Sequence, residues 1–254
     1  MFDCRVVILA AGKGKRMGAD GPKVLVPISG KPMIEYLVES VHASGIDEKP
    51  LIVVGHEMEK VKACLQERCE FVIQQQQLGT GHALQCALSQ IGDAKYIILL
   101  YGDHAFTSSK TIYELAKTSV SVEAPVTLMV LQTPDFEGWH SAFFDYGRIV
   151  RDKKGEVERI VERRDATEDQ LKIMEVNPGY YGFRVNWLKE HIAKLENKNA
   201  QQEFYVTDLI GLAILQGFPV KTIVVTNPLE GIGVNTPEQL RMAEEAFRSA
   251  GENI

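Results

Sequence analysis

Four basic side chains crowd into one short segment near the amino terminus, together with several glycines. Lys13, Lys15, Arg16 and Lys23 fall within eleven residues, whereas the whole chain carries a formal net charge of −6. Glycine lets the backbone approach a ligand without a Cβ in the way. Clustered cations beside an accessible backbone are typical of sites that bind polyphosphates. The segment is therefore the first candidate for chemistry, as a phosphate-binding loop.

Two common phosphate-binding motifs do not fit this loop. The dinucleotide fingerprint G-x-G-x-x-G requires a third glycine at the position of Met17, and Gly18 comes one residue late. The Walker motif requires Ser or Thr after Gly-Lys, but Gly12-Lys13 is followed by Gly14. These departures argue against an NAD-binding oxidoreductase and against a P-loop protein.

A carboxylate follows a strand-like run farther along the chain. The apolar run 96–100 has the length of a buried strand, and Tyr101, Gly102 and Asp103 come directly after it. Mg²⁺ takes few protein oxygens and keeps phosphate and water ligands. An Asp at the tip of a central strand is well placed to hold such an ion. We therefore expect Asp103 to ligate Mg²⁺.

The elements that must position these residues alternate through the first half of the chain. Apolar runs predict buried strands at 6–9, 51–54, 71–73 and 96–100. Helix-like patterns separate the strands, at 32–45, 57–68 and 80–91. This alternation predicts an α/β fold with a doubly wound, mostly parallel sheet and helices on both faces. Ligands of such folds lie beyond the carboxyl ends of the strands, where the basic loop and Asp103 are expected.

The second half has a different pattern, which predicts a small antiparallel lobe. Strand-like pieces occur at 125–132, 157–162 and 176–183, with a hairpin turn at Lys153-Lys154-Gly155. Helix-like patterns and one more strand follow, at 187–195, 204–215 and 222–225. Thr236, Pro237 and Gln239 have the spacing of a capping box, which predicts a last helix.

Composition excludes several classes of protein. Hydrophobic residues make up 45% and charged residues 24%, as in an ordinary globular protein. The acidic balance argues against nucleic acid as a partner, and no run approaches the roughly 18 apolar residues of a membrane span. The four cysteines form no C-x-x-C pair, and the six histidines lack the spacing of a zinc site. Because no signal-peptide pattern opens the chain, we expect a cytoplasmic protein.

Two longer motifs carry a resemblance to a known family. The loop reads L-A-A-G-x-G-x-R-M from Leu9, followed by P-K-V-L from Pro22. The third predicted strand leads into Q-x-x-Q-L-G-T-G-H-A, from Gln74 to Ala83. These motifs resemble those of the sugar-phosphate nucleotidyltransferases, and among them the uridylyltransferase domains that act on N-acetylglucosamine 1-phosphate. The resemblance covers essentially the whole chain and implies the Rossmann-like, glycosyltransferase-A-like version of the predicted fold.

The resemblance implies a reaction in which UTP and N-acetylglucosamine 1-phosphate give pyrophosphate and UDP-N-acetylglucosamine, a cell-envelope precursor, with Mg²⁺ as cofactor. Backbone contacts to the nucleotide are implied for Leu9, Ala10, Ala11 and Gly12. Phosphate contacts are implied for Arg16 and Lys23, and uracil recognition for Gln74, Gly79 and Thr80. Gln75 and Gln76 are expected to face solvent, and His82 to make a hydrogen bond within its helix.

The resemblance also assigns the centre of the site and its sugar side. Tyr101, Gly102 and Asp103 would line the centre, and Gly147, Glu162 and Asn177 would hold the sugar. Asp103 and Asn235 would be the two protein ligands of Mg²⁺. The catalytic set would be Arg16, Lys23 and Asp103. We expect one domain over 1–254, made of a nucleotide-binding half at about 1–133, a sugar-side lobe at about 134–235 and a terminal helix at 236–250.

Two departures from the family pattern lie on the expected sugar side. The segment 136–144 is longer than usual, and Pro178 stands where the family usually has Thr. Two alternatives therefore stay open: a nucleotidyltransferase for another sugar 1-phosphate, such as glucose 1-phosphate, and a non-catalytic nucleotide-binding homologue. No hexapeptide repeat follows, so we expect neither acetyl transfer to glucosamine 1-phosphate nor a trimer built by a β-helix; the oligomeric state is left open.

Overall fold

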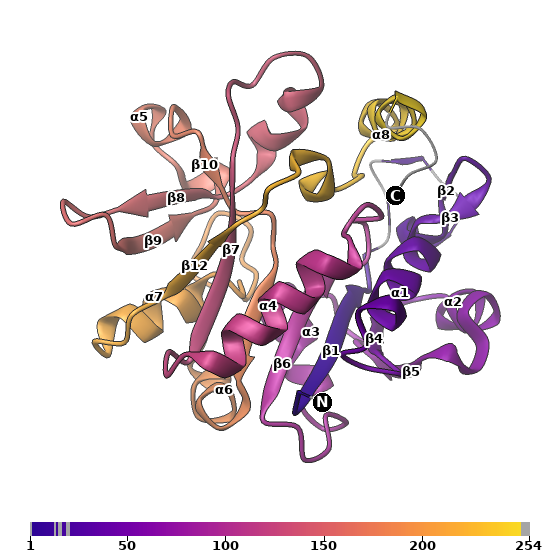
Figure 1. Ribbon diagram of the computed structural model, residues 1–254, viewed down its shortest axis with the longest axis horizontal. Coiled ribbons are helices and arrows are strands. Elements are labelled where there is room, and N and C mark those ends of the chain that lie inside the picture. Colours follow the sequence, from indigo (N-terminus) through magenta and orange to yellow (C-terminus); the bar gives the residue numbers. More distant parts are fainter. Residues whose placement is uncertain (1, 13, 15–16, 19–20, 250–254) are drawn as a thin grey trace.

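One mixed sheet runs through the molecule (Figure 1). The computed structural model describes residues 2–12, 14, 17–18 and 21–249. Within these residues, nine strands follow the order β5-β4-β1-β6-β11-β7-β10-β8-β9, and β12 also pairs with β7. The sheet is therefore continuous across both halves that the sequence suggested.

Most strands of the larger part run in the same direction. These strands are β1 (Cys4–Ala10), β4 (Leu51–Val54), β5 (Glu70–Ile73), β6 (Tyr96–Tyr101), β7 (Val126–Gln132), β11 (Tyr181–Arg184) and β12 (Lys221–Val224). β5, β4, β1 and β6 pair in parallel, and so do β12 and β7. Only β11 of this group is antiparallel, to both β6 and β7. The predicted doubly wound, mostly parallel sheet is confirmed.

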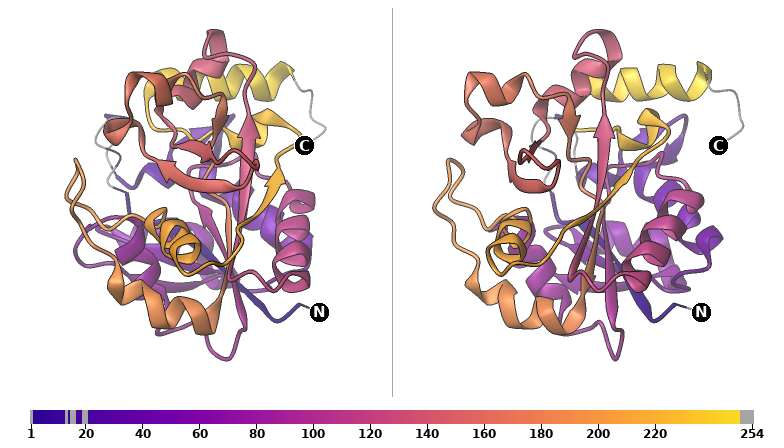
Figure 2. Two further views of the ribbon diagram at one scale, coloured as in Figure 1. Left: turned by 90° about the vertical axis from the view of Figure 1, so that its left-hand side faces the viewer. Right: turned by 60° about the vertical axis from the view of Figure 1, so that its left-hand side comes forward.

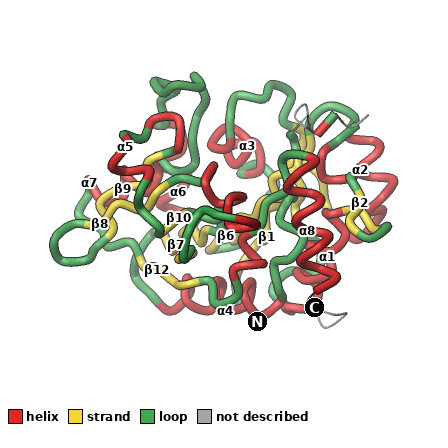
Figure 3. Tube along the Cα trace, turned by 90° about the horizontal axis from the view of Figure 1, so that it is seen from above, coloured by secondary structure: helices red, strands yellow, loops and turns green. Residues whose placement is uncertain are grey.

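Side chains of these strands alternate between two apolar layers, as the period of a strand requires. Val7, Leu51 and Leu99 face a layer with α3 (Thr80–Ala87), α6 (Val185–His191) and α7 (Asp208–Leu215). Ile8, Ile52 and Leu100 face the opposite layer, with α1 (Met33–Ser44), α2 (Met58–Leu65) and α4 (Ser109–Ser121). Figure 3 shows α3 and α4 on opposite sides of β1 and β6. Because both faces are covered, the strands are apolar on both sides and the site is confined to the strand ends.

The antiparallel lobe extends the sheet beyond β7. It consists of β8 (Arg148–Arg151), β9 (Val157–Val161) and β10 (Glu175–Val176), together with the short helix α5 (Glu168–Leu171). Arg148 is fully buried, and its guanidinium donates to the backbone oxygens of Phe144, Tyr146 and Leu171. This one side chain therefore fixes the end of the long segment 136–144 against the lobe.

The last helix closes the end of the molecule at which the parallel strands finish. α8 (Pro237–Ser249) packs against the 3₁₀ helix Gly138–Asp145 and against β2 (Pro27–Ile28), which forms a small hairpin with β3 (Lys31–Pro32). Figure 2 shows α8, in yellow, at the same end of the molecule as the carboxyl end of β7. Thr236 Oγ1 accepts the Gln239 N–H at 3.2 Å, as predicted, but the Gln239 side chain accepts from the Asn235 N–H instead of closing the box on Thr236.

Three expected elements differ from the structure. The helix expected to reach Ile91 ends at Ala87, where the Leu88 N–H bonds to Gln85 O and the Gln90 N–H to Ala87 O in tight turns that replace the helical pattern. The strand expected at 176–183 is two strands, because Gly179 turns the chain at a φ of 90° and its N–H is held by Asn177 Oδ1. The helix expected from Phe204 begins at Asp208, because Phe204 instead pairs its backbone with Leu78 and Gly81.

Among the described residues, no helix has both the length and the apolar character needed to cross a membrane.

Candidate active site

A cavity of about 470 Å³ lies at the carboxyl ends of β1, β5 and β6 and extends toward the lobe. Its wall includes most residues that the sequence proposed: Leu9, Ala10, Ala11, Gly12, Lys23, Gln74, Gly79, Thr80, Tyr101, Asp103, Gly147, Glu162, Asn177 and Asn235. Gly102 is an exception, because its N–H is bonded to Leu9 O at 2.9 Å and it does not reach the wall. Arg16 lies outside the described residues, as do Lys13 and Lys15.

The basic loop is the segment 9–23, and its described part packs against Lys23. Gly14 has a φ of 62°, and a Cβ there would lie only 3.1 Å from the Lys23 Cβ. The Met17 N–H closes a turn on Gly14 O at 2.8 Å, and the Met17 side chain is buried in a core cluster. Glycine is therefore required at position 14, and Met17 anchors the loop beside the cavity.

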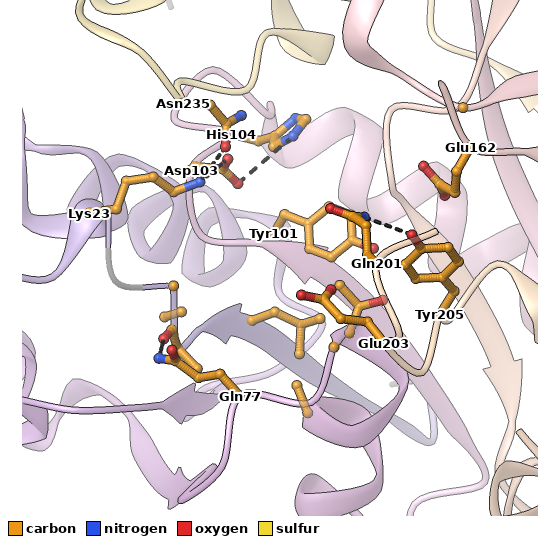
Figure 4. A pocket seen from close by; sticks show the side chains of 18 of the residues that line it. Lys23, Gln77, Tyr101, Asp103, His104, Glu162, Gln201, Glu203, Tyr205 and Asn235 are labelled. Carbon is orange, nitrogen blue, oxygen red and sulfur yellow. Dashed lines mark hydrogen bonds and ion pairs between the residues drawn. The ribbon is translucent and has the colours of Figure 1, made fainter. Parts of the chain in front are cut away.

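Lys23, Asp103 and Asn235 converge although they are far apart in the sequence (Figure 4). The Lys23 Nζ donates to Asp103 Oδ2 at 2.6 Å and to Asn235 Oδ1 at 2.8 Å. Since both oxygens contact one nitrogen, they are separated by no more than the sum of 2.6 and 2.8 Å, 5.4 Å. Val234 N–H also donates to Asp103 O at 3.1 Å, so the segment before α8 is tied to the end of β6.

Electrostatics keep the Asp103 carboxyl ionised despite its burial. Burial alone would raise the pKa of Asp103, but the charges of Lys23 and His104 and the hydrogen bond from Lys23 lower it below its usual value. A carboxylate and an amide oxygen that already share one cation are a donor set of the kind that Mg²⁺ accepts. Among the described residues, no group of three or more His, Cys, Asp or Glu side chains is arranged so that it could hold a metal ion. The two oxygens fit a metal ion whose other ligands come from phosphate and water.

His104, which the sequence reasoning did not select, also lines the cavity beside Asp103. Its Nδ1 lies 3.0 Å from Tyr180 Oη, and Thr107 Oγ1 lies 2.8 Å from the same oxygen. The Tyr180 hydroxyl donates to Glu230 O. Burial lowers the pKa of His104 and the charge of Lys23 lowers it further, against the opposing charge of Asp103.

The polar loop after β5 forms a compact group at the other end of the cavity. Gln74 is 4% exposed, and its Nε2 lies 3.0 Å from Gly79 O and 3.0 Å from His82 Nδ1. The expected hydrogen bond of His82 is therefore present. Thr80 Oγ1 accepts the Val206 N–H at 3.0 Å. Gln75 and Gln76 are exposed, as predicted.

The lobe supplies the third part of the wall. Asn177 donates to Tyr181 Oη at 2.6 Å, and its own N–H is bonded to Gly147 O at 2.9 Å. Burial raises the pKa of Glu162, although a hydrogen bond from Thr207 at 3.1 Å opposes the shift. A Cβ at Gly147 would lie 3.0 Å from an Ile160 methyl group and 3.5 Å from Glu162 Oε1, so glycine keeps this corner open.

Several residues of the cavity wall were not predicted as site residues from the sequence. Gln201, Glu203 and Tyr205 lie together on the irregular segment before α7, and Gln201 donates to Tyr205 Oη at 2.7 Å (Figure 4). Gln77 donates to Ala11 O and so joins the polar loop to the basic loop. No strand-like alternation marked these residues, because Gln202 lies between them with a φ of 54° and its N–H closes a turn on Asn199 O at 3.0 Å.

Comparison with known proteins places the chain in a family. Residues 6–168 match the family of MobA-like NTP transferase domains. A bifunctional protein GlmU of Shouchella clausii is 41% identical over 95% of this chain and 52% of its own length. A GlmU of Desulfotalea psychrophila is 38% identical over 96% of this chain and 70% of its own length. The chain spans about half the length of most such relatives.

Solved structures share the fold at low sequence identity. A UDP-glucose pyrophosphorylase complexed with UDP-glucose has a TM-score of 0.76 at 17% identity, covering 98% of this chain and 100% of that one. A putative glucose-1-phosphate thymidylyltransferase from Bacillus anthracis has a TM-score of 0.75 at 18% identity, covering 96% and 95%. The resemblance seen in the sequence motifs is thus confirmed, and the chain belongs to the nucleotidyltransferase family of MobA-like NTP transferase domains, as a relative of the GlmU proteins.

Proposed function

We propose that this chain is a uridylyltransferase that makes UDP-N-acetylglucosamine and pyrophosphate from UTP and N-acetylglucosamine 1-phosphate. The observation that carries the proposal is the pairing of Lys23 with Asp103 and Asn235 inside one cavity, with a polar loop at one end and the lobe at the other. The GlmU relatives support the choice of substrates. We further propose that the reaction takes place in the cytoplasm.

The chemistry requires no protein nucleophile. A phosphate oxygen of the sugar phosphate, already ionised at neutral pH, attacks the α-phosphorus of UTP, and pyrophosphate leaves in line. Catalysis then depends on positioning two anions and on stabilising the charge that moves to the leaving group. Lys23 supplies one ammonium at the cavity wall, and we assign a second phosphate contact to Arg16. Asp103 and Asn235 would hold Mg²⁺, which neutralises phosphate charge when it is bound.

Base selection would fall to Gln74 and the backbone of Gly79. Both hydrogen bonds that the Gln74 side-chain amide makes with described residues use Nε2, so Oε1 is the atom that we assign to the base. An amide oxygen accepts a hydrogen bond from the N3–H of uracil, whereas N3 of cytosine has no proton to donate. The Gly79 N–H and Thr80 are assigned to the remaining edge of the base. UTP should therefore be favoured over CTP.

The lobe would hold the sugar. Glu162 and Asn177 offer oxygen acceptors to the sugar hydroxyls, and Gly147 leaves room for the ring. Tyr101 lies between this side and the nucleotide side of the cavity (Figure 4). Pro178 lies in the wall at the same place, so the departure from the family pattern falls on the acceptor side.

A grid of reactions tests the assignment. The purified chain would be mixed with each of UTP, CTP, ATP and GTP and with several sugar 1-phosphates, and pyrophosphate release would be measured with and without Mg²⁺. We expect the highest kcat/KM for UTP with N-acetylglucosamine 1-phosphate. Equal use of ATP or GTP would contradict the uridylyl assignment, a preference for glucose 1-phosphate would contradict the acceptor, and no release from any pair would favour a non-catalytic homologue.

A further inference from the structure

The side chain of Gln77 bridges two segments of the cavity wall that follow different strands. Gln77 lies in the polar loop after β5, and its Nε2 donates to the backbone oxygen of Ala11 in the basic loop after β1 (Figure 4). The paired register of β1 and β4 ends at Ala10 and Val54, so Ala11 is the first residue beyond it. The Gln77 amide therefore holds the basic loop at the point where the pairing of the strands stops.

A glycine after the strand between these two segments leaves room for the bridge. β4 lies between β1 and β5 in the sheet, and Gly55 follows its last residue. A Cβ at Gly55 would lie 2.7 Å from Ala11 O and 2.9 Å from Gln77 Nε2, which is closer than a real Cβ approaches such atoms. A side chain at this position would therefore separate the donor from the acceptor. Three neighbouring strand ends thus contribute to one hydrogen bond.

The bond to Ala11 O also orients a donor on the other side of the same peptide unit. The peptide between Ala11 and Gly12 is trans and planar, so the Gly12 N–H points opposite to the Ala11 carbonyl. Gly12 lies exposed in the cavity wall, and none of the residues that the structure describes accepts a hydrogen bond from its N–H. A Cβ at Gly12 would lie 3.9 Å from Lys23 Cε, so Gly12 lies beside the Lys23 side chain. A backbone N–H next to a cation suits a phosphate oxygen.

We infer that Gln77 is a positioning residue that orients the Gly12 N–H toward a phosphate oxygen of UTP. The inference rests on the proposed function, in which the polar loop binds the base and the basic loop binds the phosphates. Because Gln77 lies three residues after Gln74, binding of uracil to Gln74 and Gly79 fixes the loop that holds Ala11 O. Recognition of the base is therefore coupled to the direction of a phosphate-binding donor. A donor oriented in advance needs no rearrangement when charge develops on the phosphates.

Separate measurements of uridine and UTP binding test the inference. Gln77→Leu keeps a side chain of similar size but removes the donor to Ala11 O. We expect the Kd of uridine, which lacks the phosphates, to stay at the parental value, and the Kd of UTP with Mg²⁺ to rise roughly 10-fold. The kcat/KM for pyrophosphate release should fall about 10- to 100-fold, because the donor is then misplaced. Gln76→Leu is the matched control, since Gln76 is exposed in the same loop.

Gly55→Ala supplies an independent variant, because Gly55 is not part of the cavity wall and the added methyl group would push Ala11 O away from Gln77. We expect the same difference between uridine and UTP, and a double variant with Gln77→Leu that loses little more than either single variant. NMR of the ¹⁵N-labelled protein adds a direct observation of the donor. UTP, but not uridine, should shift the Gly12 amide signal in the parent, and this shift should be reduced in both single variants.

Parental UTP affinity and parental kcat/KM in Gln77→Leu would overturn the inference. Equal weakening of uridine and UTP would also overturn it, because a side chain that only maintains the shape of the polar loop would affect both ligands alike. Neither result touches the proposed function as long as the parent releases pyrophosphate. A parent that binds UTP with the expected pattern of affinities and amide shifts, but never releases pyrophosphate, would contradict the proposed function and support the role of Gln77.

Discussion

Replacing Lys23 by Met would test whether the charges at the centre of the cavity form a coupled unit. The ammonium of Lys23 contacts Asp103 and Asn235, and the Lys23 and Asp103 side chains retain only 16% and 12% exposure. Removing one partner of a buried pair typically costs about 3–5 kcal/mol, and an exposed pair contributes at most about 1 kcal/mol. The residual exposure places this pair between those limits, so we expect a loss of about 2–3 kcal/mol in the free energy of unfolding.

The loss should depend on pH because it arises from the Asp103 carboxylate. In the parent, the lowered pKa of Asp103 stabilises the fold above the unfolded value of 3.8, and this contribution is lost as the pH falls through the lowered pKa. In Lys23→Met, burial without the ammonium raises that pKa, so the ionised carboxylate destabilises the fold at neutral pH. The difference between parent and variant should therefore be largest near pH 7 and should shrink toward pH 4.

Urea unfolding of a double-mutant cycle, without divalent cations, would measure the coupling. The cycle consists of Lys23→Met, Asp103→Asn and the combination, and we expect the double variant to recover at least about 1 kcal/mol. Lys31→Met is the matched control, because Lys31 pairs with the half-exposed Glu39 and should lose less than about 1 kcal/mol. Unchanged stability of Lys23→Met at pH 7, or strict additivity in the cycle, would refute the reasoning. With substrates, the same variant should lose about 10²–10³ in kcat/KM.

Three further changes probe the metal site, the base site and the fold. Asp103→Asn should nearly abolish pyrophosphate release. Asn235→Ala should lose less of this activity, and a titration with Mg²⁺ should restore part of its rate. Equal losses in the two variants, without rescue by Mg²⁺, would contradict a shared ion. Gln74→Ala should reduce the UTP-over-CTP preference in kcat/KM by roughly 5- to 150-fold, equivalent to about 1–3 kcal/mol, with the exposed Gln75→Ala as the unaffected control. Gly179→Ala should lower the free energy of unfolding by more than about 1 kcal/mol, because Gly179 has a φ of 90° and a Cβ there would lie 2.1 Å from the Tyr101 ring. An unchanged midpoint of thermal unfolding in this variant would contradict the expectation.

The part of the site that depends on local sequence was predictable. The apolar runs of β1, β5 and β6 identified strands whose carboxyl ends meet in a parallel sheet, so Leu9, Gln74 and Asp103 were expected near one another. Asn235 was placed with them by the family motif, and the structure brings its side chain to the same ammonium as Asp103. Local pattern and family resemblance thus accounted for most of the cavity wall.

Other features depend on contacts between distant segments that no local pattern specifies. The irregular segment before α7 reaches the cavity because Phe204 pairs with the start of α3 and the loop before it, through Leu78 O at 2.8 Å and Gly81 N at 2.8 Å. A helix-like composition around Phe204 gave the opposite expectation. The orientation of His104 likewise depends on Tyr180, 76 positions away, and on a backbone oxygen of Glu230. Such relations follow from the assembled fold and not from the types of neighbouring residues.

The central claim is that this cavity joins UTP directly to a sugar 1-phosphate. The most direct measurement is to incubate the purified chain with UTP, N-acetylglucosamine 1-phosphate and Mg²⁺ and to quantify both products by mass spectrometry. We predict that UDP-N-acetylglucosamine and pyrophosphate form in equal amounts and that neither forms when the sugar phosphate or the Mg²⁺ is left out. Pyrophosphate or phosphate released from UTP without the sugar nucleotide, or no product at all, would contradict the account.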